Sequence, residues 1–234
     1  MSVRRRAGEA WSFRARVESE AALRFDRLAA EIAALDASSP VSASMRRAAD
    51  DERRHEKLCA GLAAAYGEPV RETSDARIAP ARLAPRKAAL YEVVAACCIT
   101  ETESMATLAT LLAEDADPRV REVLHEIARD EVVHARMGWT HLAREAAAGD
   151  VSFLSSWIPV MLEGTVDGAL FAPADAELES PQLLRHGVLP HSRKREIFVG
   201  ALEEVVFPGL EKFNIATAPA REWLSRQAAC GGRG

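Results

Sequence analysis

The stretches of sequence that decide the fold are DERRH at residues 51–55 and DEVVH at residues 130–134, which share the pattern Asp-Glu-x-x-His. Residues three apart on a helix lie on the same face, so the glutamate and the histidine of each stretch can present two ligands to one point. These candidate ligands are Glu52, His55, Glu131 and His134. Because carboxylate and imidazole ligands together suit iron or manganese, the two stretches predict a metal site between two helices.

Long helical segments contain both stretches. Apolar residues recur at helical spacing, and no alternating run typical of a β-strand is present. Pro40 separates the first two segments, and Asp117 followed by Pro118 is a typical start for the fourth. We expect an all-α fold with long helices over residues 9–35, 42–65, 86–114 and 118–148.

The links between these segments indicate how the helices are arranged. Short links join the first segment to the second and the third to the fourth, so each pair should form an antiparallel hairpin. The link between the two hairpins is long enough to cross the length of a bundle. This connectivity predicts a four-helix bundle with one long crossover.

The chain continues beyond the bundle with residues that carry apolar stripes but no ligand set. We expect helices over residues 152–170 and 192–213, a kink at Pro208, a further helix from Pro219, a short turn of helix at Ser180-Pro181, and disorder at residues 231–234. No internal linker indicates a second domain, so residues 1–234 should form one domain. It would comprise a metal-binding bundle at residues 9–148 and an extension at 151–229, which packs on the bundle and shapes access to the site, or forms a homodimer face.

A site for two metal ions needs one more glutamate from each of the other two helices. The third segment offers Glu101 and Glu103, and Glu101 is favoured because it lies on an apolar stripe at about the same height as Glu131. The first segment offers Glu18 and Glu20. Apolar neighbours favour Glu18, although the height along the helix slightly favours Glu20.

The aspartate that precedes each ligand glutamate suggests how the histidines are oriented. A metal-bound imidazole normally donates its other ring N–H to a carboxylate. On a helix neither aspartate can face the same point as the glutamate next to it, but each can reach across to the other helix. We therefore predict crossed pairs, Asp51 with His134 and Asp130 with His55.

Over residues 9–148, the order Glu, Glu-x-x-His, Glu, Glu-x-x-His on four successive helices resembles the ferritin-like di-iron carboxylate superfamily. The resemblance implies a ferritin-like bundle that holds two iron ions, with a manganese–iron pair as the alternative. Its metal ligands, which are also its catalytic residues, would be Glu18, Glu52, His55, Glu101, Glu131 and His134. Asp51 and Asp130 would support the cofactor, and the arginine before His55 is similar to that of oxygen-activating branches such as bacterial multicomponent monooxygenases.

The resemblance implies an oxidoreductase that activates dioxygen with electrons from an external donor and oxidises a small organic substrate. The chain departs from several branches at single positions. Ser104 and the lack of C-x-x-C pairs argue against rubrerythrin-type peroxidases, Met105 against multicomponent monooxygenases, and Ile127 against N-oxygenases. Aldehyde-deformylating oxygenases are similar in size and spacing. The alternatives are a ferroxidase or peroxide-scavenging protein that handles iron, and a metal-free helical interaction module.

Composition excludes several other classes of protein. The chain has 234 residues and a formal net charge of −5, so no nucleic-acid partner is indicated. No window reaches the roughly 18 uncharged apolar residues that a membrane span requires. The four cysteines form no C-x-x-C pair, which argues against a structural zinc site or a disulfide framework and favours a cytoplasmic location. They are Cys59, Cys97, Cys98 and Cys230.

Overall fold

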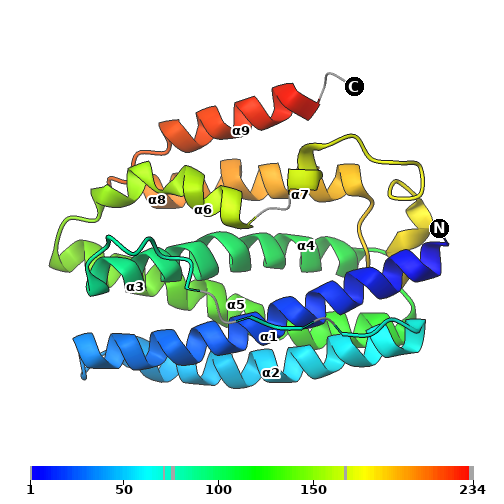
Figure 1. The fold of residues 1–234 in the computed structure, drawn as a ribbon, viewed down its shortest axis with the longest axis horizontal. Coiled ribbons are helices and arrows are strands. Elements are labelled where there is room, and N and C mark those ends of the chain that lie inside the picture. Colours follow the sequence, from blue (N-terminus) through cyan, green and yellow to red (C-terminus); the bar gives the residue numbers. More distant parts are fainter. Residues whose placement is uncertain (1, 71, 75–76, 166–167, 232–234) are drawn as a thin grey trace.

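The computed structural model describes residues 2–70, 72–74, 77–165 and 168–231, and every regular element in these ranges is helical. Four long helical stretches form a bundle, which confirms the expected all-α fold (Figure 1). These stretches are α1 (Val3–Leu35), α2 (Pro40–Tyr66), the third stretch of α3 (Pro85–Val93), η1 (Val94–Thr100) and α4 (Glu101–Ala113), and α5 (Pro118–Ala148). None of the helices so described is long and apolar enough to span a bilayer.

The helix ends follow local capping chemistry. Helix α1 begins at Val3, earlier than expected at residue 9, because the Ser2 side chain accepts a hydrogen bond from the Arg5 backbone N–H. Burial begins in the second turn with Ala7 and Gly8 and continues to Trp11, whose Nε1 donates to the His186 carbonyl at 2.8 Å. Helix α5 begins at Pro118 as expected, with Asp117 as its cap.

The third stretch is interrupted by a π-helix, which the sequence pattern did not indicate. In η1 the backbone bonds to the fifth preceding residue, as the Glu101 N–H does to the Ala96 carbonyl, so the turn holds one extra residue. This wider segment lies close against α5 at Gly138. A Cβ added there would come within 2.3 Å of the Cys97 Cβ, so glycine is what permits the approach.

The described parts of the crossover between the hairpins, residues 67–70, 72–74 and 77–84, lie along the bundle beside α1 and α3 (Figure 1). The crossover leaves α2 at Gly67, whose φ of 86° lies in the left-handed region that glycine adopts readily. Near its other end, the backbone N–H of Ala79 donates to the fully buried carboxylate of Glu92 on α3. Arg27 of α1 also donates to Glu92, at 2.8 Å. The buried carboxylate therefore connects the crossover to both hairpins.

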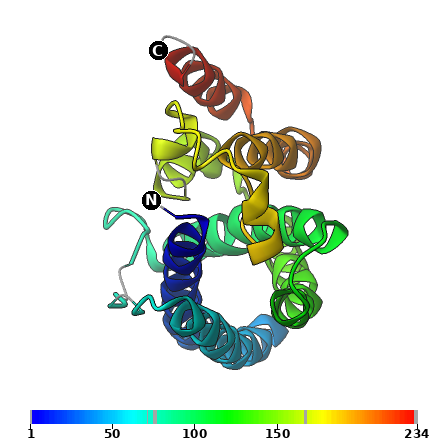
Figure 2. The same ribbon diagram turned by 90° about the vertical axis from the view of Figure 1, so that its right-hand side faces the viewer.

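The C-terminal residues form a second layer over the third stretch, and α9 lies outermost (Figures 1 and 2). The helix expected over residues 152–170 is instead divided into short elements. The segment 192–213 is helical but changes to π-helix just before Pro208, which has no N–H to donate. The elements are η2 (Ser152–Ser156), α6 (Ile158–Thr165), η3 (Gly168–Phe171), η4 (Pro181–His186), α7 (His191–Ala201), η5 (Leu202–Val206), α8 (Phe207–Glu211) and α9 (Ala218–Gly231). Of the expected disordered end, Gly231 closes α9, and residues 232–234 lie outside the described ranges.

One apolar cluster joins the C-terminal layer to the bundle. It includes Leu90 of α3 and both Cys98 and Ile99 of η1, packed with Ile158 of α6 and Phe207 of α8. All five side chains are buried. The extension thus packs on the bundle as expected, mainly over the third stretch (Figure 2), and η4 also contacts α1 at Trp11.

Candidate metal centre

The four helical stretches bring all six predicted ligands together inside the bundle. Glu18 comes from α1, a Glu–His pair from each of α2 and α5, and Glu101 from the first turn of α4, directly after η1. All six side chains are buried, which is unusual for carboxylates without charged partners. The structure therefore places four carboxyl groups and two imidazoles in one enclosed cluster.

Within the cluster, the ligand atoms form two overlapping groups, in each of which all atoms lie within 4.8 Å of one another. Subsite A consists of Glu18, Glu52, His55 and Glu131, and subsite B of Glu52, Glu101, Glu131 and His134. Glu52 and Glu131 belong to both groups. This geometry can hold two neighbouring cations that share two carboxylates, as in ferritin-like di-metal sites.

The structure also separates the alternatives that the sequence left open. Glu20 lies outside the cluster and pairs with Arg16 at 2.6 Å. Glu103 accepts a hydrogen bond from the Thr107 hydroxyl at 2.9 Å. Glu18 and Glu101 are thus the glutamates placed to act as ligands on α1 and α4.

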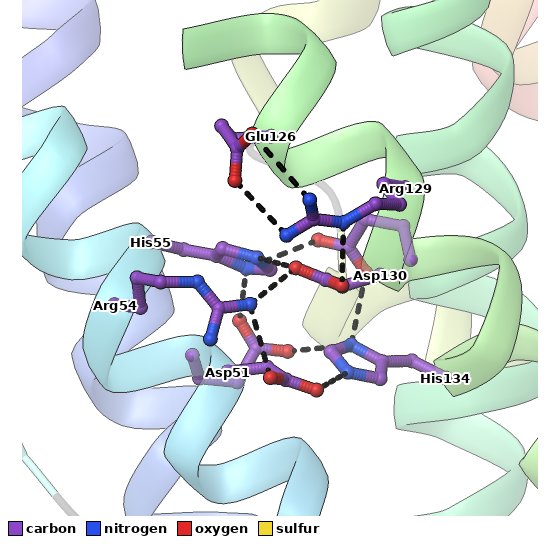
Figure 3. Close-up of polar contacts among 9 residues, drawn as sticks. Asp51, Arg54, His55, Glu126, Arg129, Asp130 and His134 are labelled. Carbon is purple, nitrogen blue, oxygen red and sulfur yellow. Dashed lines mark hydrogen bonds and ion pairs between the residues drawn. The ribbon is translucent and has the colours of Figure 1, made fainter.

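Both histidines are oriented by the crossed aspartate pairs that the sequence predicted (Figure 3). His55 Nε2 lies 3.1 Å from Asp130 Oδ2, and His134 Nε2 lies 3.4 Å from Asp51 Oδ2. The Nδ1 atoms face the opposite way, at 3.2 Å and 3.0 Å from the two oxygens of Glu52. An Nε2–H donated to aspartate leaves the Nδ1 lone pair free to bind a metal ion.

Unpartnered polar atoms show that the cluster fits a cation. Glu52 Oε1, Glu131 Oε2 and His134 Nδ1 are buried without a hydrogen-bond partner. His134 Nδ1 lies 3.0 Å and 3.3 Å from these two oxygens, but the contacts lack hydrogen-bond geometry. In the absence of a cation, only the charge attraction between His134 and these carboxylates offsets the cost of burying the three atoms. A bound cation would satisfy all three atoms at once, and their donor chemistry suits iron.

The carboxyl groups of the cluster resist ionisation in the absence of a cation. Burial, followed by the charge of Glu52, raises the pKa of Glu18 well above its usual value. Burial and the neighbouring Glu131 do the same to the pKa of Glu101. Burial and the charge of Glu52 raise the pKa of Glu131 to about 7. When metal ions bind, these three glutamates would therefore release their carboxyl protons, because the positive ions take the place of the protons.

Glu52 and His134 form the ionised pair of the metal-free cluster. Burial opposes the ionisation of Glu52, but its close contacts with His134 and His55 prevail and lower its pKa to about 2. Burial likewise opposes the charge on His134, but the nearby Glu131 and Glu52 raise its pKa to about 12. A proton on His134 thus compensates part of the negative charge that a metal ion would otherwise neutralise.

Arg54 is a residue of the site whose role the sequence pattern did not reveal. It precedes His55, and its guanidinium donates to Asp51 and to Asp130 (Figure 3). In the sequence, this arginine was only a point of resemblance to other families. Its contact with Asp130 could not be foreseen, because that contact depends on how α2 and α5 pack. Arg129 also reaches Asp130, from within α5.

Comparisons with known proteins place the fold of this chain. A sequence model described as rubrerythrin matches residues 13–139, which include all six predicted ligands. No curated protein matches the chain. Among solved structures, a Synechococcus protein described as having aldehyde deformylating oxidase activity matches with a TM-score of 0.63 and 18% identity. The match covers 97% of this chain and 98% of that one, so the shared fold includes the C-terminal layer as well as the ferritin-like bundle.

Proposed function

Because the chain belongs to the rubrerythrin family, we propose that it is a non-haem di-iron oxidoreductase that uses dioxygen to oxidise a small organic substrate. The observation that carries the proposal is the buried cluster of four carboxyl groups and two imidazoles, with three polar atoms that lack a hydrogen-bond partner. Two ferrous ions bound there would supply the electrons that reduce dioxygen. An external donor would then have to restore the ferrous state.

The residues of the chain have distinct roles in this proposal. Glu52 and Glu131 belong to both subsites and would bind both ions, whereas Glu18 and Glu101 would each bind one. Asp51 and Asp130 keep the Nδ1 atoms of the histidines directed at the ions. All six ligand side chains are buried, and burial away from water strengthens the electrostatic interactions in the site.

Oxidation of an organic molecule is favoured over peroxide removal by residues outside the ligand set. Ser104 stands where rubrerythrin-type peroxidases carry a further glutamate, and the C-x-x-C pairs of their second iron site are absent from the sequence. We expect the substrate to enter beside α4 near Ser104 and Met105, both of which are half-buried. An aldehyde is the first substrate class to test, since the Synechococcus protein is described as acting on aldehydes.

The test measures oxygen consumption by protein that has been loaded anaerobically with ferrous iron. In the presence of a reductant, we expect one aldehyde from a series of increasing chain length to accelerate oxygen uptake and to yield an oxidised or shortened product. Product identity is determined by mass spectrometry, and Glu131→Ala provides the inactive control. Catalytic conversion of ferrous to ferric iron at a rate that no organic compound alters would decide for a ferroxidase instead.

A further inference from the structure

One guanidinium nitrogen lies between the two aspartates that orient the histidines. Arg54 Nη2 is 3.0 Å from Asp51 Oδ1, and it also donates to Asp130 Oδ2. The same Asp130 oxygen contacts His55 Nε2, and the other oxygen of Asp51 faces His134 Nε2. Figure 3 shows this arrangement, in which Arg54 lies beside both crossed pairs. A single side chain of α2 therefore contacts the supports of both histidines.

The second motif does not supply an equivalent arginine. Val133 occupies the position in α5 that Arg54 occupies in α2, and its side chain is 59% exposed. Arg129 donates to Asp130 Oδ1, the oxygen that does not contact His55, at 3.4 Å, and it also pairs with Glu126. The sequence asymmetry between the motifs thus leaves Arg54 as the cation shared by the two aspartates.

Charge explains why the shared contact matters. Asp51 and Asp130 come from different helices, yet both are close enough to accept from one nitrogen. Two carboxylates at such a separation repel each other unless a cation lies between them. Without Arg54 we expect the carboxylates to move apart, and each would then lose its alignment with the histidine it supports.

We propose that Arg54 is a positioning residue that orients His55 in subsite A and His134 in subsite B together, and so couples the affinities of the two subsites for metal. The inference rests on the metal centre of the proposed function. It concerns the metal-free geometry of this chain, so binding of a redox-inactive ion can test it without any assay of turnover.

The chain offers a closely matched control in Arg53. Both arginines are on α2, both have side chains that are 42% exposed, and each pairs with the aspartate three residues before it. Arg53 differs in that its other partner is Asp26 on α1, away from the histidines. Arg53→Met therefore removes a similar charge and a similar pair of contacts without touching the crossed aspartates.

The experiment measures zinc binding to the full chain by calorimetry, for wild type, Arg54→Met and Arg53→Met. We expect both zinc ions to bind about tenfold more weakly to Arg54→Met, the lower end of what loss of a ligand-orienting contact typically costs, and Arg53→Met to resemble wild type. Arg54→Lys should recover most of the affinity, because one nitrogen makes both contacts and an ammonium group can replace it. If Arg54→Met does not fold, Arg54→Gln takes its place in the comparison.

A spectroscopic measurement distinguishes orientation from general destabilisation. In the zinc-loaded protein, ¹⁵N spectra of histidine should show Nδ1 bound to metal and a slowly exchanging Nε2–H on both His55 and His134. Arg54→Met should accelerate the exchange of both protons. The inference is overturned if Arg54→Met binds zinc as Arg53→Met does, or if only one histidine responds. Failure of the wild type to bind zinc or ferrous iron would instead refute the metal centre itself, and the inference with it.

Discussion

The two hairpins of the bundle supply the same three ligands, a lone glutamate and a Glu-x-x-His pair, but their surroundings differ. Helices α1 and α2 are uninterrupted. In the second hairpin, the third stretch, which pairs with α5, changes to π-helix immediately before Glu101. The C-terminal layer packs mainly on the second hairpin through its third stretch (Figure 2), and it meets the first hairpin where η4 contacts α1. The ligand pattern therefore needs only helical periodicity, and the two hairpins bring their ligands to the same site by different packing.

The largest expected effect is on the number of iron ions bound per chain, which shows whether the two hairpins contribute equally to metal binding. Glu52 and Glu131 are shared by both subsites, so Glu52→Ala and Glu131→Ala should each lower the iron content from about two ions per chain to nearly none. Glu18→Ala and Glu101→Ala should each retain about one ion, because each removes a ligand from one subsite. Elemental analysis after anaerobic loading measures these values. One ion retained in Glu52→Ala but none in Glu131→Ala would show that the hairpins are not equivalent.

The next prediction concerns the C-terminal layer, which packs mainly on the second hairpin. A truncation that ends at Gly149 keeps all six cluster residues but exposes the apolar side chains that pack on α6 and α8, such as Cys98 and Ile99. We expect the truncated chain to aggregate, because exposed apolar patches of that kind drive association. Light scattering after size-exclusion chromatography measures the outcome. A soluble monomer with full iron content would show that the second hairpin does not need its cover.

A pair of glycine substitutions compares packing in the two hairpins directly. Gly138→Ala in α5 would bring a Cβ within 2.3 Å of Cys97, so we expect a loss of about 1–3 kcal/mol in the free energy of unfolding. Gly61→Ala in α2 has no neighbour closer than 4.0 Å and should stabilise the protein by about 0.5 kcal/mol. Urea denaturation of both variants measures the difference. Equal effects would contradict the close approach of η1 to α5.

The smallest effect is the pH dependence of the metal-free protein, where the two shared glutamates differ. The pKa of Glu131 is raised to about 7 and that of His134 to about 12, so both contribute stability at low pH that is lost as the pH rises. For Glu131 this loss extends from about pH 4.5 to about 7. Glu52, with its pKa lowered to about 2, stays ionised over this range and contributes no change.

We therefore expect the melting temperature of the metal-free protein to fall between pH 5 and pH 8, as measured by calorimetry. The buried His141 acts in the opposite direction, because burial lowers its pKa, so the fall should be steeper in His141→Gln. In zinc-loaded protein the trend should reverse, since metal ions bind the deprotonated ligands. A melting temperature that rises with pH in the metal-free wild type would show that the cluster is not protonated as described.

Periodicity and motif spacing were sufficient to predict the bundle and the residues that meet inside it. The crossed pair of Asp51 with His134 followed from helix geometry and from the need for a partner on the second ring nitrogen. The choice of Glu18 over Glu20 followed from apolar neighbours, because such neighbours mark the face of a helix that turns inward. These features depend on interactions within one helix or on a rule that holds for most metal-bound histidines.

Features that depend on packing between helices could not be predicted in the same way. The π-helix η1 has the same apolar composition as an α-helix, and it packs against both α5 and the C-terminal layer. The bridge from Arg54 to Asp130 depends on the distance between α2 and α5, which no local pattern contains. The division of residues 152–165 into η2 and α6 likewise accompanies packing on the bundle, where Leu154 and Ile158 share a cluster with η1.

Because η1 holds one extra residue, the number of residues in this segment, rather than their identity, determines where Glu101 lies. In an ordinary helix interior, deletion of one residue turns everything downstream by about 100° and disrupts packing. Between Val94 and Thr100 the same deletion can return the chain to regular α-helix and leave Glu101 in phase with α3. Conversion of η1 to α-helix at constant length would turn Glu101 out of the cluster. We therefore expect this segment to tolerate the loss of one residue better than any other turn of the four long stretches.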